Sequence, residues 1–341
     1  MIPIGQSLRY EYLYLSTIVL IYLKEKQNLI TLMRSDSFFQ VFCITTVPFT
    51  SSFVADQLRS HYLNPFKRTL AVMRKANTDS THYHYSPFLI DNDAYDTKTA
   101  LIILNSPIRN PPSPLFDKLW DMANFRICAD GGANRLFDAT TGNAYYTPDL
   151  IRGDLDSLRQ DVRDYYSDKR VRIEKDPCQD TNDLDKCLQI VSKEWLEGNG
   201  PDHRICMYGA FGGRFDQEMA SIQSLYKWKD VFQSKLFLYD DYTSAFLLSE
   251  GVNHEIRLPF HGERIPTEAD IGDGPTCGLI PMGSKCESIK TTGLKWDLHG
   301  DVPLEFGGLV STSNRLMEAV VTVQATHPLV FTAEIMAGRN I

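Results

Sequence analysis

From Thr99 onward, short apolar segments alternate with segments of helical periodicity, and several of the apolar segments end in aspartate or glycine. This alternation predicts strands at 100–104, 125–129, 170–174, 204–208 and 235–239. Helices are expected at 115–122, 182–196 and 215–228. Strands that alternate with helices pair in parallel, so residues 86–248 are predicted to form an α/β domain. Ligands of such sheets bind at the carboxyl ends of the strands.

The helical pattern disappears after about Ser249. Glycines and prolines then separate short β-like runs at 288–292, 308–312 and 319–324. Such runs are typical of strands joined by tight turns. Residues 249–341 are therefore predicted to form a separate all-β domain.

Residues 1–85 differ from the rest, because they are rich in Tyr, Phe, Ser and Thr and show no clear periodicity. We expect a poorly ordered extension here. It is either a targeting presequence or, as we favour, the product of an upstream start, since Met33 or Met73 would begin a shorter chain that keeps every motif below. An uncharged, mostly apolar run near its start, Tyr12 to Leu23, has 12 residues. A helix that spans a bilayer needs about 20 residues, so no membrane association is expected.

Charge and cysteine content narrow the classes of partner. Lys and Arg total 35 against 43 Asp and Glu, which gives a net charge of −8. This balance offers no overall attraction to nucleic acid and favours a small ligand carried with a divalent cation. The seven cysteines contain no Cys-x-x-Cys pair, so we expect neither a disulfide scaffold nor a zinc site. Free thiols indicate a reducing compartment, and a cytoplasmic location is predicted.

The strongest local motif is the segment 151–157, which contains Asp154 and Asp156. In extended backbone, side chains two residues apart point the same way, so both carboxylates would face one spot. Magnesium takes one or two protein carboxylates and leaves its other positions to water and substrate phosphates. The alternative is an acidic turn in which Asp156 and Ser157 cap the helix that begins near Leu158.

A second acidic cluster, 176–183, again follows a predicted strand and precedes a helix. Asp180 and Asp183 are three residues apart, which also suits a helix N-cap and its partner. The cluster gains weight because Asp130, Asp154 and Asp156 lie at other strand ends of the same predicted sheet. Carboxylates that gather in this way repel one another, and a cation offsets the repulsion.

The segment 209–217 is rich in glycine and opens a predicted helix. Its backbone suits close approach to a phosphate, and Arg214 offers a forked donor, although most glycine turns merely reverse the chain. The turn 130–135 has the same two interpretations. In the C-terminal half, Trp296 offers a flat face to a cationic or heteroaromatic ring, and its alternative is a place in the core. Ser311 and Ser313 are further candidate binding residues, and the alternative is that they are ordinary turn residues.

Taken in order, these motifs resemble the eukaryotic thiamine pyrophosphokinase family. The matching segments are 128–136, 153–157, 180–188, 212–217, 277–281, 292–296 and 311–314. The resemblance implies an α/β nucleotide-binding domain followed by a β-sandwich domain. It further implies a homodimer with thiamine sites at the subunit interface, and transfer of the diphosphoryl group of ATP to the thiamine hydroxyl in the presence of Mg²⁺, which releases AMP.

The resemblance also assigns site residues by position. Asp154, Asp156 and Asp183 correspond to the magnesium ligands, and Arg214 and Asp216 join them as catalytic residues. The residues expected around ATP are Asp130, Gly131, Gly132, Asp180, Gly212, Gly213 and Arg214. Asp216 and Gln217 would lie near the phosphates or the thiamine hydroxyl. The residues expected around the thiamine pyrimidine are Trp296, which would come from the partner subunit, Ser311 and Ser313.

One departure and two rival functions remain at this stage. Asp185 stands where the family pattern has a hydroxyl or other polar residue. A non-catalytic thiamine or nucleotide sensor would bind without turnover, and a magnesium-dependent nucleotide hydrolase would release phosphate without thiamine. We favour the enzyme over the sensor, because a sensor has no need of five aligned carboxylates. The general base is left unassigned between Asp154 and Asp216.

Overall fold

The computed structural model describes residues 19–24, 29–35, 42–48, 81–84, 98–196, 203–257 and 275–335. The chain divides into two compact units, Met1–Arg74 and Lys75–Ile341. In the first unit, strands β1 (Val19–Lys24), β2 (Leu29–Ser35) and β3 (Phe42–Pro48) form an antiparallel sheet in that order. The remainder of the first 80 residues lies outside the described residues, so their predicted poor order stays a prediction.

The second unit contains a ten-stranded sheet, and one half of it is parallel. The parallel half runs in the order β10-β9-β5-β6-β7-β8. Its strands are β5 (Lys98–Ile103), β6 (Phe125–Ala129), β7 (Leu150–Gly153), β8 (Arg172–Lys175), β9 (His203–Tyr208) and β10 (Leu236–Tyr239). The predicted parallel sheet is confirmed.

Helices cover both faces of the parallel half. They are α3 (Pro114–Met122), α4 (Gly132–Thr140), α5 (Gln160–Asp168), α6 (Asp183–Ile190) and α8 (Phe215–Lys227). Alternate strand residues bury opposite faces, so Leu101 and Ile103 pack with α3, α4 and α5, whereas Ala100 and Ile102 pack with α6 and α8. In the described part of the chain, no helix combines the length and the apolarity that a membrane crossing requires.

The other half of the same sheet is antiparallel. There, β11 (Thr243–Leu248) pairs with β10 and with β17 (Leu329–Glu334), and β13 (Thr276–Ile280) lies between β17 and β15 (Ser311–Arg315). A four-stranded sheet of β14 (Ile289–Thr292), β16 (Val320–Ala325), β12 (Asn253–Arg257) and β4 (Thr81–His84) completes the fold.

The four-stranded sheet and the antiparallel half share one hydrophobic core, to which Ile256 and Val321 contribute from one sheet and Phe246 and Phe331 from the other. Residues after 249 therefore form strands in two stacked layers, and their described part contains no helix. The structure differs from the expectation of a separate domain, because β13, β15 and β17 extend the sheet of the α/β half. The expected boundary at 248 coincides with the end of β11, which is already antiparallel.

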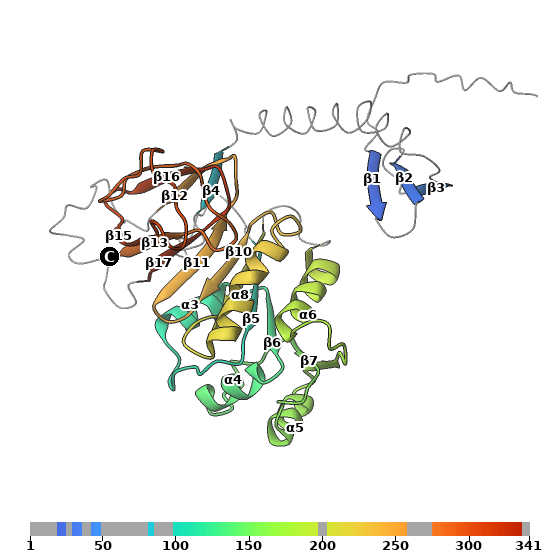
Figure 1. The fold of residues 1–341 in the computed structure, drawn as a ribbon. Helices are drawn as coiled ribbons and strands as arrows, with labels where there is room; N and C mark the ends of the chain where they lie inside the picture. Colours follow the sequence, from blue (N-terminus) through green and yellow to red (C-terminus); the bar gives the residue numbers. More distant parts are fainter. Residues whose placement is uncertain are drawn as a thin grey trace, which may run out of the picture. The chain divides into compact units, whose positions relative to one another are not determined.

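The expected end of the N-terminal extension, at residue 85, is corrected by β4. This strand pairs in parallel with β12, from His82 opposite His254 to His84 opposite Ile256 (Figure 1). His84 is buried, and its Nε2 lies 2.9 Å from Nδ1 of His254. The segment 81–84 therefore belongs to the fold. Sequence reasoning missed it because a four-residue strand with two histidines carries no clear hydrophobic alternation.

Candidate active site

All six parallel strands point their carboxyl ends toward one edge of the sheet, and the loops that follow them carry the candidate residues. The strand order reverses at β5, which has β6 on one side and β9 on the other. At this switch point the Ser106 hydroxyl donates a 2.6 Å hydrogen bond to the carbonyl of Gly209. This contact ties the loop after β5 to the glycine-rich loop after β9.

Three carboxylates meet at this edge. Asp130, Asp154 and Asp183 each offer an oxygen, and the three oxygens lie within 4.8 Å of one another. Asp130 and Asp154 follow β6 and β7, and Asp183 opens α6. Of the three predicted magnesium ligands, the structure brings together Asp154 and Asp183, and the third member of the cluster is Asp130. Asp156 is exposed and lies outside this group.

The backbone around the cluster is adapted to this close approach. Asp130 and Leu155 have φ values of 42° and 62°, in the left-handed region that side chains other than glycine rarely adopt. A Cβ atom on Gly153 would lie 2.7 Å from Cβ of Asp130 and 3.0 Å from Oδ1 of Asp183. Glycine at this position leaves the space in which the two carboxylates converge.

Lys186 is the internal cation of the cluster. It is buried, and its Nζ lies 3.0 Å from Oδ1 of Asp183 and 3.9 Å from Oδ2 of Asp154. Burial disfavours its charge, yet the two carboxylates raise the pKa of Lys186. Three carboxylates against one ammonium leave two negative charges uncompensated.

The pKa values of the carboxylates respond to these surroundings. Burial raises the pKa of Asp130, and the charges of Asp183 and Asp154 add to the increase. One oxygen of Asp130, Oδ2, accepts the Ser157 N–H at 3.2 Å, whereas the buried Oδ1 has no hydrogen-bond partner among the described residues. The backbone N–H of Asp156 lowers the pKa of Asp154, and Lys186 acts in the same direction.

These properties fit a divalent cation with hard oxygen ligands. Asp130 has a buried oxygen without a hydrogen-bond partner, and it belongs to the cluster that also carries the excess negative charge. Mg²⁺ suits such a set, because it binds few protein carboxylates and keeps positions for water and phosphate.

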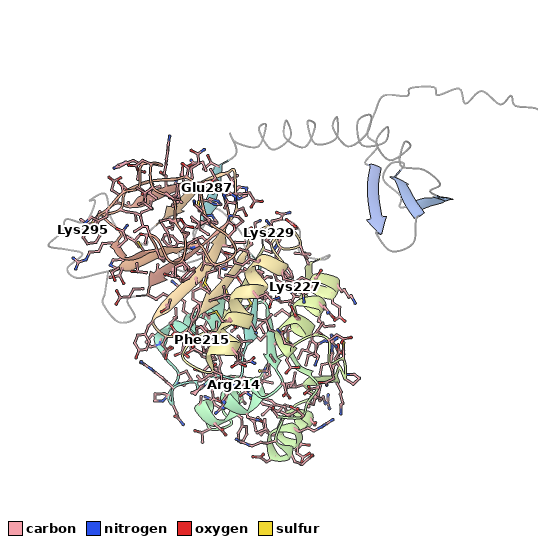
Figure 2. All side chains as sticks on the ribbon, viewed as in Figure 1. Arg214, Phe215, Lys227, Lys229, Glu287 and Lys295 are labelled. Carbon is pink, nitrogen blue, oxygen red and sulfur yellow. The ribbon has the colours of Figure 1, made fainter. Side chains whose placement is uncertain are left out.

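The glycine-rich loop after β9 leads into α8. Its Gly212 and Gly213 N–H groups both donate to Oε1 of Glu218, and Arg214 pairs with Asp216 at 2.6 Å. Figure 2 shows Arg214 and Phe215 together at one end of α8. Both are well exposed, and Gln217 is exposed beside them. The predicted cluster of donors is therefore open to solvent.

The remaining residues predicted to surround ATP differ in their surroundings. A Cβ atom on Gly132 would lie 2.3 Å from the carbonyl oxygen of Ile103, so glycine permits α4 to start against β5. A Cβ atom on Gly131 would meet the Asn105 side chain at 2.4 Å. Asp180 is exposed, and no contact of its side chain with the cluster is found among the described residues.

The residues predicted to surround thiamine lie in the antiparallel half. Trp296 is 56% exposed, and the buried Asn314 holds its backbone through two hydrogen bonds, to its N–H and its carbonyl. Ser311 is buried beside Asn314, and Ser313 is exposed with a φ of 56°. These contacts remain within the β14–β15 region. Lys295, the neighbour of Trp296, lies far from Arg214 in Figure 2.

Sequence reasoning assigned no role to two residues that the structure places at the site. The sequence did contain a signal for Lys186, because a lysine three residues after Asp183 falls on the same side of a helix. Arg152 lies within the first motif, beside Gly153, and binds Glu174 and Asp176, while its Nε donates to the carbonyl of Lys186. It thus anchors the start of α6 to β7.

Asp185, the departure from the family pattern, is buried and faces away from the cluster. Its Oδ1 accepts the indole N–H of Trp228 and its Oδ2 pairs with Lys227, both at 2.8 Å. Its extra carboxylate joins α6 to the end of α8.

Comparisons with known proteins agree with this architecture. The profile "Thiamin pyrophosphokinase, catalytic domain" matches residues 116–238, and "Thiamin pyrophosphokinase, vitamin B1 binding domain" matches residues 262–330. Thiamine pyrophosphokinase 1 of Oryza sativa subsp. japonica is 38% identical over 245 residues, which are 68% of this chain and 86% of that protein. Thiamine pyrophosphokinase 1 of Arabidopsis thaliana is 36% identical, over 74% of this chain and 92% of the relative.

A solved structure gives the same result. The crystal structure of yeast thiamin pyrophosphokinase superimposes with a TM-score of 0.63 at 27% identity, and covers 77% of this chain and 93% of its own. The two profiles fall on the parallel half and on the antiparallel half of the fold, in the order in which the chain presents them. With its acidic edge, its glycine-rich loop and these relatives, the chain belongs to the thiamine pyrophosphokinase family.

Proposed function

We propose that the protein transfers the diphosphoryl group of ATP to the hydroxyl of thiamine, so that thiamine diphosphate and AMP are formed. The observation that carries this proposal is the convergence of Asp130, Asp154 and Asp183 at the carboxyl edge of the parallel sheet. Family membership gives the reaction, and the acidic cluster gives the place where a cation and a triphosphate would meet.

Asp154, Asp183 and Asp130 would hold Mg²⁺, and Asp156 would support this set through its backbone N–H, which donates to Oδ1 of Asp154. Bound Mg²⁺ supplies charge neutralisation for the phosphate oxygens. Lys186 pairs with Asp183 and lies near Asp154, and so orients both carboxylates. Asp180 with the turns at Gly131–Gly132 and Gly212–Gly213 would line the path of ATP, with backbone N–H groups available for phosphate oxygens.

The chemistry requires the thiamine hydroxyl oxygen to attack the β-phosphorus in line with the departing AMP. Arg214 can fork onto the transferred group once it leaves Asp216. Arg214 lowers the pKa of Asp216, and Asp154 also has a lowered pKa, so both are poor proton acceptors in this arrangement. Their carboxylates would instead bind and orient the substrates, and Gln217 lies beside Asp216 at the same end of α8.

The thiamine site is proposed to form between two subunits of a homodimer. Trp296 is exposed in a segment that also exposes the apolar side chains of Val302, Phe306 and Leu309. An apolar surface of this kind is typical of an interface. Trp296 would stack on the pyrimidine of thiamine bound against the catalytic edge of the partner subunit, with Ser311 and Ser313 at the ring.

A cytoplasmic location is proposed from the state of the cysteines. Cys128, Cys178, Cys187, Cys206, Cys277 and Cys286 are free, and all of these except Cys178 are buried. Unpaired thiols of this kind are typical of proteins from reducing compartments.

The proposal is tested by AMP formation in the presence of ATP, thiamine and Mg²⁺. We expect omission of thiamine or Mg²⁺ to abolish AMP formation, and Asp154→Asn to lower kcat by about 10²-fold or more, with an unchanged circular dichroism spectrum. The matched control is Asp161→Asn on α5, whose exposed carboxylate pairs with Arg159. ADP with thiamine monophosphate as products would contradict the reaction. Binding without turnover would indicate the sensor, and phosphate release without thiamine the hydrolase.

A further inference from the structure

The glycine-rich loop already holds an anion. The backbone N–H of Gly212 lies 2.9 Å and that of Gly213 lies 3.2 Å from the same oxygen, Oε1 of Glu218. Two successive N–H groups that face one oxygen form a nest for anions, and the positive end of α8 lies beside it. The carboxylate of Glu218 therefore occupies donors of the kind that bind a phosphate oxygen.

The surroundings leave room for a ligand at this nest. A Cβ atom on Gly212 would meet nothing within 4 Å, and one on Gly213 would meet only the Ser106 hydroxyl at 3.6 Å. Gly212 has a φ of 81°, which glycine adopts without strain. The space beside both α-carbons is therefore open, and the loop presents its backbone to solvent.

Arg214 repeats the pattern. Its guanidinium, the other strong anion donor of the loop, is paired with the carboxylate of Asp216 at 2.6 Å. Asp216 and Glu218 both stand in the first turn of α8. Acidic side chains of one helical turn thus hold both kinds of donor that this loop would offer to phosphate.

The negative charge of Glu218 has no cationic partner in the ion pairs recorded among the described residues. This charge also affects Asp240. Burial raises the pKa of Asp240, and the charges of Asp241 and Glu218 add to the increase. A phosphate that entered the nest would experience the same repulsion. Both anions cannot hold these two N–H groups together.

We propose that Glu218 is an internal competitor for the phosphates of ATP: it keeps the Gly212–Gly213 nest formed in the free protein and must leave the nest when nucleotide binds. This inference rests on the proposed function, which places ATP at this loop. Glu218 thereby sets the affinity for nucleotide without touching the reacting atoms. Its side chain reaches the nest from α8 and can rotate away without movement of the helix.

Glu218→Gln separates charge from shape. The amide oxygen can still accept both N–H groups, so the loop stays formed, but a neutral acceptor binds them more weakly than a carboxylate. We expect the variant to bind nucleotide about five- to tenfold more tightly, because hydrogen bonds to charged groups are about twice as strong as neutral ones. The KM for ATP should fall while kcat stays unchanged. A merely structural role for Glu218 would raise KM or leave it unaltered.

The experiment uses the full chain and titration calorimetry with α,β-methylene-ATP and Mg²⁺, a probe that resists cleavage at the bond in question. The control is Glu287→Gln, an exposed carboxylate paired with Lys285 and distant from Arg214 in Figure 2. Tighter binding by Glu218→Gln alone supports the inference. Equal or weaker binding by Glu218→Gln overturns it. Failure of the unaltered protein to bind the probe overturns the proposed nucleotide site itself, which is a different result.

A second measurement checks the contact in the ligand-free protein. Amide hydrogen exchange at residues 212–213 should be slow in the unaltered protein, similar in Glu218→Gln and faster in Glu218→Ala, because only alanine lacks an acceptor. Equal exchange in all three proteins would overturn the inference whether or not nucleotide binds.

Discussion

Lys186 shows how one side chain can decide the electrostatics of a site. It is 2% exposed at the side chain and lies between two carboxylates that would otherwise repel each other. Removal of one partner from a buried ion pair is costly, because it leaves the other charges uncompensated. The lysine therefore stabilises the cluster in the absence of a cation and limits its charge in the presence of one.

We expect Lys186→Met to lower the free energy of unfolding by about 3 kcal/mol without Mg²⁺, because three carboxylates then remain without an ammonium. Added Mg²⁺ should raise the melting temperature of the variant more than that of the unaltered protein. Thermal unfolding with and without Mg²⁺ measures both effects. Lys229→Met is the control, since its pair with Glu250 lies nearer the surface and is worth about 1 kcal/mol or less. An equal Mg²⁺ effect in both proteins would contradict the role of Lys186.

Residue types and spacing predicted the acidic cluster because its chemistry is local to strand ends. The structure brings Asp154 and Asp183 together as expected, with Asp130 rather than Asp156 beside them, and their role as magnesium ligands stays a prediction. Alternation in an extended segment argued for Asp156. The left-handed φ of the intervening Leu155 breaks that alternation, and backbone conformation at a single residue is not readable from sequence pattern. Asp130 joins the cluster with a left-handed φ of its own backbone, which the sequence pattern does not reveal either.

At the scale of elements, α6 and α8 are linked by Asp185. Its buried carboxylate accepts from Trp228 and pairs with Lys227 at the end of α8. These two helices cover the same face of the sheet and carry Asp183 and the glycine-rich loop at their starts. The link fixes the position of one helix against the other.

We expect Asp185→Ala to destabilise the protein by about 2–3 kcal/mol, because the buried indole N–H and the ammonium lose their acceptor. Lys227→Met should cost about 1 kcal/mol or less, since Lys227 is partly exposed. Urea denaturation gives both values. At 25 °C the KM values of Asp185→Ala should stay close to those of the unaltered protein, and a selective rise in the KM for ATP would assign the residue to binding instead.

The pair of β4 and β12 introduces a pH dependence. Burial lowers the pKa of His254 to about 4, and burial together with His254 and His82 lowers that of His84. Both histidines have an ordinary pKa near 6.5 when unfolded, so the unfolded chain takes up protons that the folded one refuses below that pH. Folding stability should therefore fall as the pH falls from about 6.5 to 4 and stay constant in this respect above 6.5.

We expect urea midpoints measured between pH 7.5 and 4.5 to fall less steeply for His254→Gln than for the unaltered protein. Glutamine can donate to the Ser249 carbonyl and accept from His84 as His254 does, but it does not titrate. Each histidine contributes at most about 1.4 kcal/mol per pH unit. Parallel pH profiles of the two proteins would show that this pair does not set the acid sensitivity.

For the whole molecule, periodicity predicted the parallel half well, because its strands are continuous apolar runs with helices between them. It did not predict that β11 joins the two halves or that β4 adds to the second sheet. Those pairings are long-range, and a strand of four residues contains no information about its partner. The sequence predicted the structural class of each half, but it did not predict that the two halves share one sheet.

The separation of Trp296 from the catalytic edge leads to a prediction about assembly. If each thiamine site takes its catalytic residues from one subunit and Trp296 from the other, Asp154→Asn and Trp296→Ala fail in different subunits of the same site. Mixed dimers of the two inactive variants then contain one intact site.

After coexpression of the two variants, random pairing should restore about a quarter of the unaltered specific activity, because half of the dimers are mixed and each has one of two sites intact. Steady-state AMP formation measures this value. The specific activity of each variant expressed alone gives the baseline. Activity no higher than the sum of the two baselines would place the complete thiamine site within a single chain.

The shared sheet has a mechanical consequence. Residues 236–239 of β10 and 243–248 of β11 are joined edge to edge by main-chain hydrogen bonds, from Phe237 opposite Phe246 to Tyr239 opposite Ser244. A hinge motion between the two halves would break these hydrogen bonds, so we expect the two halves to move as one rigid body. We therefore expect any movement that accompanies substrate binding to be confined to the loops at the carboxyl edge of the sheet.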